Sequence, residues 1–463
     1  MSQEVRIERD SLGEIPVPKM AYYGIATERA KRNFNISGVS ADKKMIYALV
    51  IVKKAAALAN HEVGSLSLKK CRFIEQACDE ILAGKFDDEF VTDSIQGGAG
   101  TSFNMNVNEV IANRANELAG FALGSYSLVH PNDDVNMGQS TNDVVPTAAK
   151  LALIWKAEVL GLAMNRMIAV LLDLAEEFDD VIKLGRTHLQ DAVPIRLGQV
   201  FAAFASVHMR ELNHLEFALS DMHVLNMGAT AVGTGITASR RYIELVTGYI
   251  NELSGIYFLP ASNLVDATRH TDYYTRLSAS LKNCAVSLSK MCNDLRLMAS
   301  GPRGGLAEII LPPVQPGSSI MPGKVNPVIP EVVNQVCFSV IGNDVTVSKA
   351  VEAGQLELNV FAPVIVKTLL ESISLLTQAI DTLTEKALTG LQSNRENCSL
   401  ITEHSAGVAT ALIPYIGYDR ASSIAKESLA RRVSVREILL EEHLFDEVQL
   451  DEILNVYHMT EIR

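Results

Sequence analysis

Residues 317–327 have the types and spacing best suited to chemistry. They read GSSIMPGKVNP and follow the proline-rich stretch 311–316, which cannot continue a helix. We therefore expect a loop punctuated by glycine and proline, and such a loop suits a lid that opens and closes. Ser318, Ser319 and Lys324 offer a base and a partner for an anion. The alternative is a plain surface loop.

Three other segments are rich in small, hydroxyl and amide residues, which contribute little to an apolar core. Residues 97–106 (GGAGTSFNMN) fit either a tight turn before a helix or a backbone that approaches a ligand; no phosphate-loop lysine follows.

Residues 130–143 contain Ser-Thr-Asn, which suits a helix N-cap and equally a set of neutral donors for a carboxylate. Residues 185–191 (GRTHLQD) place His188 among polar neighbours. A lone histidine is more often structural, but here it could bind an anion or move a proton.

Long helical patterns over residues 141–395 must position these segments. Two runs of apolar residues have steps of three and four, the seam of a coiled-coil-like helix pair. Small residues on the other faces of the first helix would let neighbours approach closely. The pattern fits an ordinary helical core and a bundle shared between subunits equally well. The two seams are Leu277, Leu281, Cys284, Leu288, Met291, Leu295, Met298 and Val366, Leu369, Ile373, Leu376, Ile380, Leu383, Ala387.

The domain organisation predicted from these patterns has three parts. An N-terminal domain, residues 1–140, mixes short helical segments with Gly-rich and Asn-rich loops. A central helical-bundle domain spans 141–395. A small C-terminal domain, 396–463, contains shorter amphipathic pieces such as 433–442.

Composition narrows the class of protein. The chain has 463 residues, 48% of them hydrophobic, and a net charge of −13, which argues against binding to nucleic acid or to an anionic membrane. Six cysteines without a CxxC pair indicate reduced thiols. The N-terminus lacks the apolar core of a signal peptide, and the apolar stretch 151–174 carries too many charges to span a membrane. We therefore expect a cytoplasmic protein; the net charge does not argue against a small anionic substrate, and the sequence has no cofactor motif and no metal-spaced cluster.

The loop GSSIMPGKVNP resembles the signature loop of the aspartase/fumarase superfamily, and the other three segments resemble its remaining active-site regions in the same order. The resemblance runs from about Arg6 to near the C-terminus. Residues 98–104, 139–143, 190–194, 330–336 and 354–360 are similar to the aspartase form of these regions rather than to the class II fumarase form. Gly138, Gly304, the pair Ile236-Thr237 and a short C-terminus depart from the usual pattern.

This resemblance implies a mostly α, three-domain fold whose central long-helix bundle forms a twenty-helix core in a homotetramer. Each active site would draw residues from three subunits. The implied reaction is reversible deamination of L-aspartate to fumarate and ammonia, an anti-elimination through an aci-carboxylate intermediate. The alternatives are a class II fumarate hydratase, which converts fumarate to L-malate, and a non-catalytic helical scaffold.

The resemblance also implies roles for individual residues. Ser318 would be the base that removes the C3 proton, and Asn142 would bind the substrate ammonium with the Thr101 and His188 region. His188 would bind substrate first and shuttle protons second, supported by Glu331. No cofactor or metal is implied. The β-carboxylate set is Thr101, Ser140, Thr141, Thr187 and His188; the α-carboxylate set is Lys324 and Asn326; Ser319, Ile320 and Met321 complete the substrate-binding residues; Ser318, His188 and Lys324 form the catalytic set.

Overall fold

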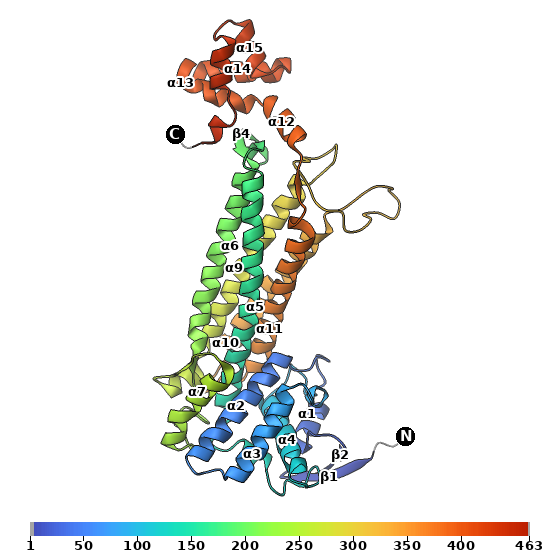
Figure 1. Ribbon diagram of the computed structural model, residues 1–463, viewed down its shortest axis with the longest axis vertical. Coiled ribbons are helices and arrows are strands. Elements are labelled where there is room, and N and C mark those ends of the chain that lie inside the picture. Colours follow the sequence, from blue (N-terminus) through green and yellow to red (C-terminus); the bar gives the residue numbers. More distant parts are fainter. Residues whose placement is uncertain (1–3, 462–463) are drawn as a thin grey trace. The chain divides into compact units, whose positions relative to one another are not determined.

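The computed structural model describes residues 4–461, and its elements are shown in Figure 1. Helices dominate and the strands occur only in pairs, which confirms the mostly α prediction. The chain forms two compact units. Unit 1 comprises Met1–Gly161, Asn213–Asn283 and Ser339–Leu375, and unit 2 comprises Leu162–Leu212, Cys284–Phe338 and Leu376–Arg463. The three-part division expected from the sequence stays a prediction.

The first part of unit 1 is more ordered than the sequence suggested. An antiparallel hairpin and the nine-residue helix α1 come first, and the next three helices are longer: α2 has 20 residues, α3 has 15 and α4 has 18. The expectation of short helical segments is therefore wrong for these three helices, although α1 is short. The elements are β1 (Val5–Asp10), β2 (Gly13–Pro18), α1 (Ile25–Asn33), α2 (Lys43–Glu62), α3 (Leu68–Leu82), η1 (Asp87–Glu89), α4 (Thr101–Leu118) and η2 (Pro131–Val135).

Helix α4 buries several asparagines, a residue type that the sequence analysis had expected in the loops of residues 1–140. Asparagine is typical of turns because its side chain competes for backbone hydrogen bonds. In α4 these side chains instead reach neighbouring segments: Asn106 donates to the carbonyl of Glu89, and Asn113 to that of Tyr22. Carbonyls of other segments thus accept from the amide nitrogens of these two asparagines, which helps the helix to bury them.

The rest of unit 1 contains parts of the long helices and a small parallel strand pair. Polar pairs join the helices within the unit: the hydroxyl of Ser278 donates to the carboxylate of Asp344 over 2.8 Å, and Asn343 donates to Ser372 over 3.0 Å. The elements are α5 (Thr141–Glu177), η3 (Asp221–His223), β5 (Val224–Leu225), α7 (Arg240–Ser254), β6 (Leu259–Pro260), α8 (Leu264–Arg269), α9 (Asp272–Met298), α10 (Val328–Glu352) and α11 (Ala362–Leu383).

Unit 2 holds the other parts of α5, α9, α10 and α11, which run alongside α6 (Leu197–Ser220) in Figure 1. Both predicted heptad seams are buried along their whole length, which confirms them as helix-packing seams. The sequence did not predict the antiparallel hairpin β3 (Ile182–Thr187) and β4 (Gln190–Arg196) between two long helices. A further strand pair joins β7 (Ile309–Ile310) to β8 (Gln392–Ser393).

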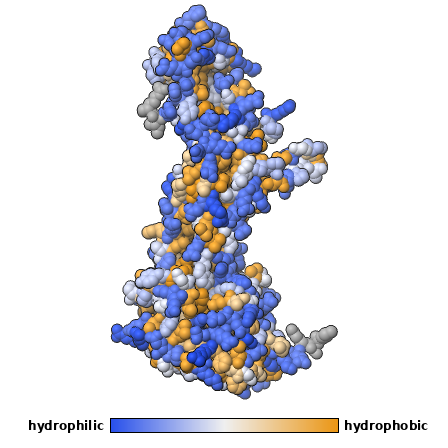
Figure 2. All heavy atoms as spheres, in the orientation of Figure 1, coloured by the Kyte–Doolittle hydropathy of each residue, from blue (hydrophilic) through white to orange (hydrophobic). Residues whose placement is uncertain are grey.

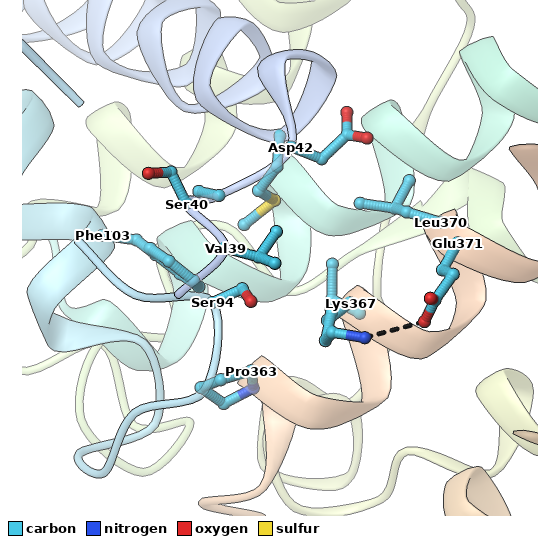
Figure 3. Close-up of a pocket in the computed structure, with 12 residues that line it drawn as sticks. Val39, Ser40, Asp42, Ser94, Phe103, Pro363, Lys367, Leu370 and Glu371 are labelled. Atoms are coloured by element: carbon cyan, nitrogen blue, oxygen red, sulfur yellow. Dashed lines mark hydrogen bonds and ion pairs between the residues drawn. The ribbon is translucent and has the colours of Figure 1, made fainter. Parts of the chain in front are cut away.

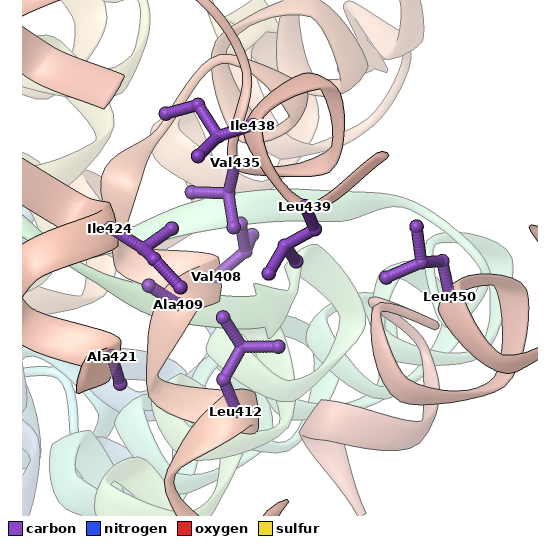
Figure 4. Packing of buried hydrophobic residues seen from close by; sticks show 9 residues of the cluster. All are labelled: Val408, Ala409, Leu412, Ala421, Ile424, Val435, Ile438, Leu439 and Leu450. Carbon is purple, nitrogen blue, oxygen red and sulfur yellow. The ribbon is translucent and has the colours of Figure 1, made fainter. Parts of the chain in front are cut away.

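The last 70 residues of unit 2 have their own apolar core, shown in Figure 4. The predicted amphipathic piece 433–442 is confirmed as α15, which begins with a capping box at Ser434 and Glu437. Nine buried aliphatic residues form the centre of this apolar core, among them Leu412, Ile424 and Leu439. The elements are η4 (Thr384–Leu388), α12 (Arg395–Glu403), η5 (Ala406–Leu412), α13 (Ile413–Ile416), α14 (Tyr418–Arg431), α15 (Val435–Glu441), α16 (Glu447–Ile453) and η6 (His458–Thr460).

All six cysteines are free, as expected for reduced thiols, and all six are buried. The helical run Ala362–Leu388 is long and apolar enough to cross a membrane, but 67% of its most apolar window is buried inside the structure, as in the core helix of a soluble protein.

Candidate functional site

The first motif forms a tight turn that opens α4. Gly98, Ala99 and Gly100 all have positive φ, at 90°, 58° and 95°. A Cβ on Gly100 would lie 3.0 Å from the side chain of Val145, so this position favours glycine on two grounds. The turn interpretation is confirmed, and the turn places Thr101 as the first residue of the helix.

The second motif caps α5 and meets the first motif. The Ser140 hydroxyl accepts from the backbone N–H of Asn142 over 3.2 Å, which confirms the capping interpretation. The hydroxyl oxygens of Thr101 and Thr141 lie 3.3 Å apart. Because these residues begin α4 and α5, two helix N-termini meet here, and their partial positive charges favour a bound anion.

Two buried titratable side chains, Asp143 and Lys53, belong to the same part of unit 1, and the sequence analysis missed both. Asp143 is fully buried, and burial raises the pKa of its carboxyl to about 6. Lys53 is also fully buried; desolvation lowers its pKa to about 7, and its Nζ donates to Asn136 and Gln139. A lysine directly after the apolar run of residues 45–52 was the one available signal.

The third motif is the turn of the β3–β4 hairpin. His188 and Leu189 have positive φ (53° and 60°), as in a two-residue type I′ turn, and Thr187 and His188 are exposed. The hairpin is anchored by Glu308, which is 1% exposed and pairs with Lys183 at 3.0 Å and with Arg186 at 2.5 Å. Sequence reasoning missed Glu308 because its partners lie more than 120 residues earlier.

The fourth motif is a loop, as predicted, with Ser318 inside a turn of its own. The hydroxyl oxygen of Ser318 accepts from the backbone N–H of Ile320 at 3.2 Å and of Met321 at 3.0 Å. Figure 1 shows this segment as an extension from the helices of unit 2, and Ile320 is 84% exposed.

The neck of this loop is closed by hydrogen bonds at its two ends. The N–H of Gly317 donates to the carbonyl of Lys324 over 2.7 Å, and the Asn326 side-chain amide donates to the carbonyl of Gly317 over 2.7 Å. Within residues 4–461 the Lys324 ammonium has no hydrogen bond or ion pair, so it is available to an anion.

A hydrogen bond between Thr101 and Thr141 brings the first and second motifs together within unit 1. Thr101, Ser140, Thr141 and Asn142 belong to unit 1, and the Thr187–His188 turn and the Ser318 loop belong to unit 2. Glu331 lies exposed in the first turn of α10, and among the described residues it makes no ion pair with His188.

A separate cavity of about 190 Å³ in unit 1, shown in Figure 3, contains none of the predicted site residues. It lies between α2, α4 and α11, with apolar walls and an ion pair between Lys367 and Glu371 on its lining. None of the residues that line this cavity belongs to the four motifs, so we do not assign the cavity to the candidate site. In the part of the chain that the structure describes, no group of three or more His, Cys, Asp or Glu side chains is placed to hold a metal.

Known proteins resemble the chain over almost its whole length. A family model described as lyase matches residues 13–342, and one described as fumarase C C-terminus matches residues 408–461. Aspartate ammonia-lyases of Bacillus sp and Bacillus subtilis are 51% and 52% identical; the matches cover 99% of this chain, and 98% and 96% of the relatives.

Solved structures agree with this match. A fumarate lyase:delta crystallin from Brucella melitensis bound to cobalt is 49% identical, with a TM-score of 0.97 over 99% of this chain and 100% of that one. A class II fumarase from Schistosoma mansoni is 37% identical, with a TM-score of 0.95 over 98% of this chain and 99% of that one. The chain therefore belongs to the lyase family that contains the aspartate ammonia-lyases and the class II fumarases.

Proposed function

We propose that this protein is an aspartate ammonia-lyase, which converts L-aspartate reversibly to fumarate and ammonia. The observation that carries the proposal is identity of about 50% to relatives of that name over nearly the full chain, against 37% to a class II fumarase. The motifs at residues 98–104, 139–143 and 190–194 favour the same activity.

Ser318 is the proposed base. A serine hydroxyl is a weak base unless its oxyanion is stabilised. The N–H groups of Ile320 and Met321 point at its oxygen, and the free ammonium of Lys324 belongs to the same loop. These donors favour the ionised serine, which takes the C3 proton of the substrate.

The negative charge that develops on proton removal spreads into the β-carboxylate, so donors must be placed where that charge appears. Thr101, Ser140 and Thr141 supply hydroxyls at two helix N-termini, and Thr187 and His188 add donors from the hairpin turn. Lys324 and Asn326 are the proposed partners of the α-carboxylate, with Ser319, Ile320 and Met321 closing over the substrate. Asn142 is the proposed partner of the ammonium.

We further propose that the active protein is a cytoplasmic homotetramer, with each site built from three subunits. Large apolar side chains are exposed on the long helices, including Phe217 (76%), Phe338 (62%) and Val345 (62%). Figure 2 shows such apolar surface among polar residues. Burying it against other copies of the chain would be favourable. Assembly would also let His188 and Glu331 of different copies pair.

One assay separates the proposed activity from fumarate hydration. The expected result is growth of fumarate's ultraviolet absorbance on addition of L-aspartate, and aspartate formation from fumarate plus ammonium. Malate formed from fumarate without ammonium would support the hydratase instead.

The base assignment is tested by Ser318→Ala. Because a general base contributes roughly 10²- to 10⁴-fold, kcat should fall by that amount while the inhibition constant of succinate, which cannot react, stays similar. Near-normal elimination by the variant would show that another group is the base.

Shared sites are tested by mixing two inactive variants, Ser318→Ala and His188→Ala, after reversible dissociation. If sites combine residues of different subunits, some sites in the mixed assembly contain neither substitution, and activity returns. Mixtures that stay inactive while forming mixed tetramers would contradict the proposal.

A further inference from the structure

We propose that Asp143 and the loop formed by residues 226–231 are a positioning device that orients the Asn142 side-chain amide, so that its oxygen accepts from the substrate ammonium. This inference rests on the proposed function and deepens it. Neither Asp143 nor the loop has a role in the binding sets given above.

Asp143 joins two segments that are distant in the sequence. One carboxylate oxygen accepts from the N–H of Ser140 over 2.9 Å. The other accepts from the N–H groups of Gly228 at 3.1 Å and Thr230 at 2.9 Å. The side chain is fully buried, so water does not compete for these bonds. One carboxylate thus ties the start of α5 to the loop.

The loop in turn holds Asn142 at two points. The Nδ2 group of Asn142 donates to the carbonyl of Ala231 over 2.7 Å, and its main-chain carbonyl accepts from the side chain of Asn226 over 3.1 Å. The amide nitrogen is therefore committed to the loop, and Oδ1 is turned away from it. An ammonium group has donors only, so it needs that oxygen; a reversed amide would present N–H to N–H.

Helix capping alone does not account for Asp143. A carboxylate at the third helical position needs to reach only the N-cap N–H, which here is that of Ser140. The second oxygen serves residues of the loop instead. Two of these, Gly228 (φ 87°) and Thr230 (φ 56°), have left-handed backbone conformations, and Thr230 adopts one that L-residues with a branched Cβ seldom take. The carboxylate therefore helps to hold the loop in an uncommon shape.

The test is Asp143→Asn with Asp93→Asn as the matched control. Asp93 is also a buried carboxylate in unit 1, and it accepts from the N–H groups of Ile36, Ser37 and Gly38. Each amide variant turns an NH₂ group against backbone N–H groups. We expect Asp143→Asn to raise the KM for L-aspartate about tenfold or more, while Asp93→Asn lowers the unfolding temperature without changing KM. An unchanged KM in Asp143→Asn would overturn the proposal.

A double-mutant cycle asks whether Asp143 acts through Asn142. In the Asn142→Ala background, Asp143→Asn should change kcat/KM by less than about twofold, because the group that it orients is gone. Full additivity of the two substitutions would reduce Asp143 to a structural residue. If Asp143→Asn does not fold, Asn226→Ala serves in its place. Asn226→Ala removes the hydrogen bond to the main-chain carbonyl of Asn142 and should raise the KM less than Asp143→Asn does. An unchanged KM in Asn226→Ala would again overturn the proposal.

A crystal structure of Asp143→Asn gives a readout that does not depend on activity. We expect the contact between Asn142 Nδ2 and the Ala231 carbonyl to be lost. Its retention would overturn the positioning role, even if the native protein deaminates aspartate. Conversely, a native protein inactive on aspartate would refute the proposed function, and the contact in the variant would still decide the positioning role.

Discussion

The hydroxyl oxygens of Thr101 and Thr141 lie 3.3 Å apart, although 40 residues separate them in the chain. Each residue is the first of its helix, so the contact brings the N-termini of α4 and α5 together. Two such termini with two hydroxyls form a site suited to one carboxylate.

Removing one of these hydroxyls should weaken substrate binding. We expect Thr141→Val to raise the KM for L-aspartate roughly tenfold, because a donor to the carboxylate is lost while side-chain volume is kept. Steady-state kinetics measure this effect. Thr147→Val is the control: Thr147 is buried in the same helix with its hydroxyl unpaired, so its loss should leave KM unchanged. Equal effects of both substitutions would contradict a role specific to Thr141.

The neck of the Ser318 loop should not tolerate a side chain at Gly317. A Cβ there would lie 2.7 Å from the Lys324 carbonyl oxygen and 2.8 Å from the Asn326 nitrogen, so the neck would have to open. We expect Gly317→Ala to lower kcat/KM at least about tenfold, with little change in unfolding temperature, because only an exposed loop is disturbed. In Gly304→Ala, where a Cβ meets nothing within 4 Å, activity should persist. Normal kcat/KM in Gly317→Ala would show that the neck is dispensable.

The buried ion cluster at the hairpin should dominate local stability. Glu308→Gln leaves Lys183 and Arg186 without their carboxylate, and breaking a buried pair typically costs about 3–5 kcal/mol. Chemical denaturation of the variant measures this loss. Glu352→Gln, which breaks the exposed pair with Lys349, should leave the unfolding midpoint almost unchanged, because water screens that pair. Similar losses in both variants would refute the assignment of Glu308 as the anchor.

Stability should fall as pH rises through the range in which Glu109 ionises. This carboxyl belongs to α4 and accepts from backbone N–H groups at the start of α1, and burial raises its pKa to about 6 from 4.5. Its protonated form is favoured in the folded state, so the contribution is full below pH 4.5 and is lost as pH rises through 6. In Glu109→Gln we expect the unfolding temperature to change less with pH between these two values than it does in the native protein. A profile parallel to that of the native protein would contradict this account.

Much of the site could be predicted from the sequence because it depends on neighbours in the chain. Proline and glycine around residues 311–327 exclude a helix by local geometry alone, and a loop is found there. Ser140 caps α5 through an amide two residues away. The heptad spacing along α9 likewise follows from one helical period, so its seam is buried as predicted.

Other features were decided only by the tertiary structure, because their partners are distant in sequence. The sequence analysis expected Asn-rich loops in residues 1–140, but the asparagines of α4 lie in a helix, where Asn106 and Asn113 donate to carbonyls of other segments. Asp143 meets Gly228 across 85 residues, and Glu308 meets Arg186 across 122. The sequence specifies which polar groups need hydrogen-bond partners, and burial makes it costly to leave them unpaired. Only the folded chain determines which distant group supplies each bond.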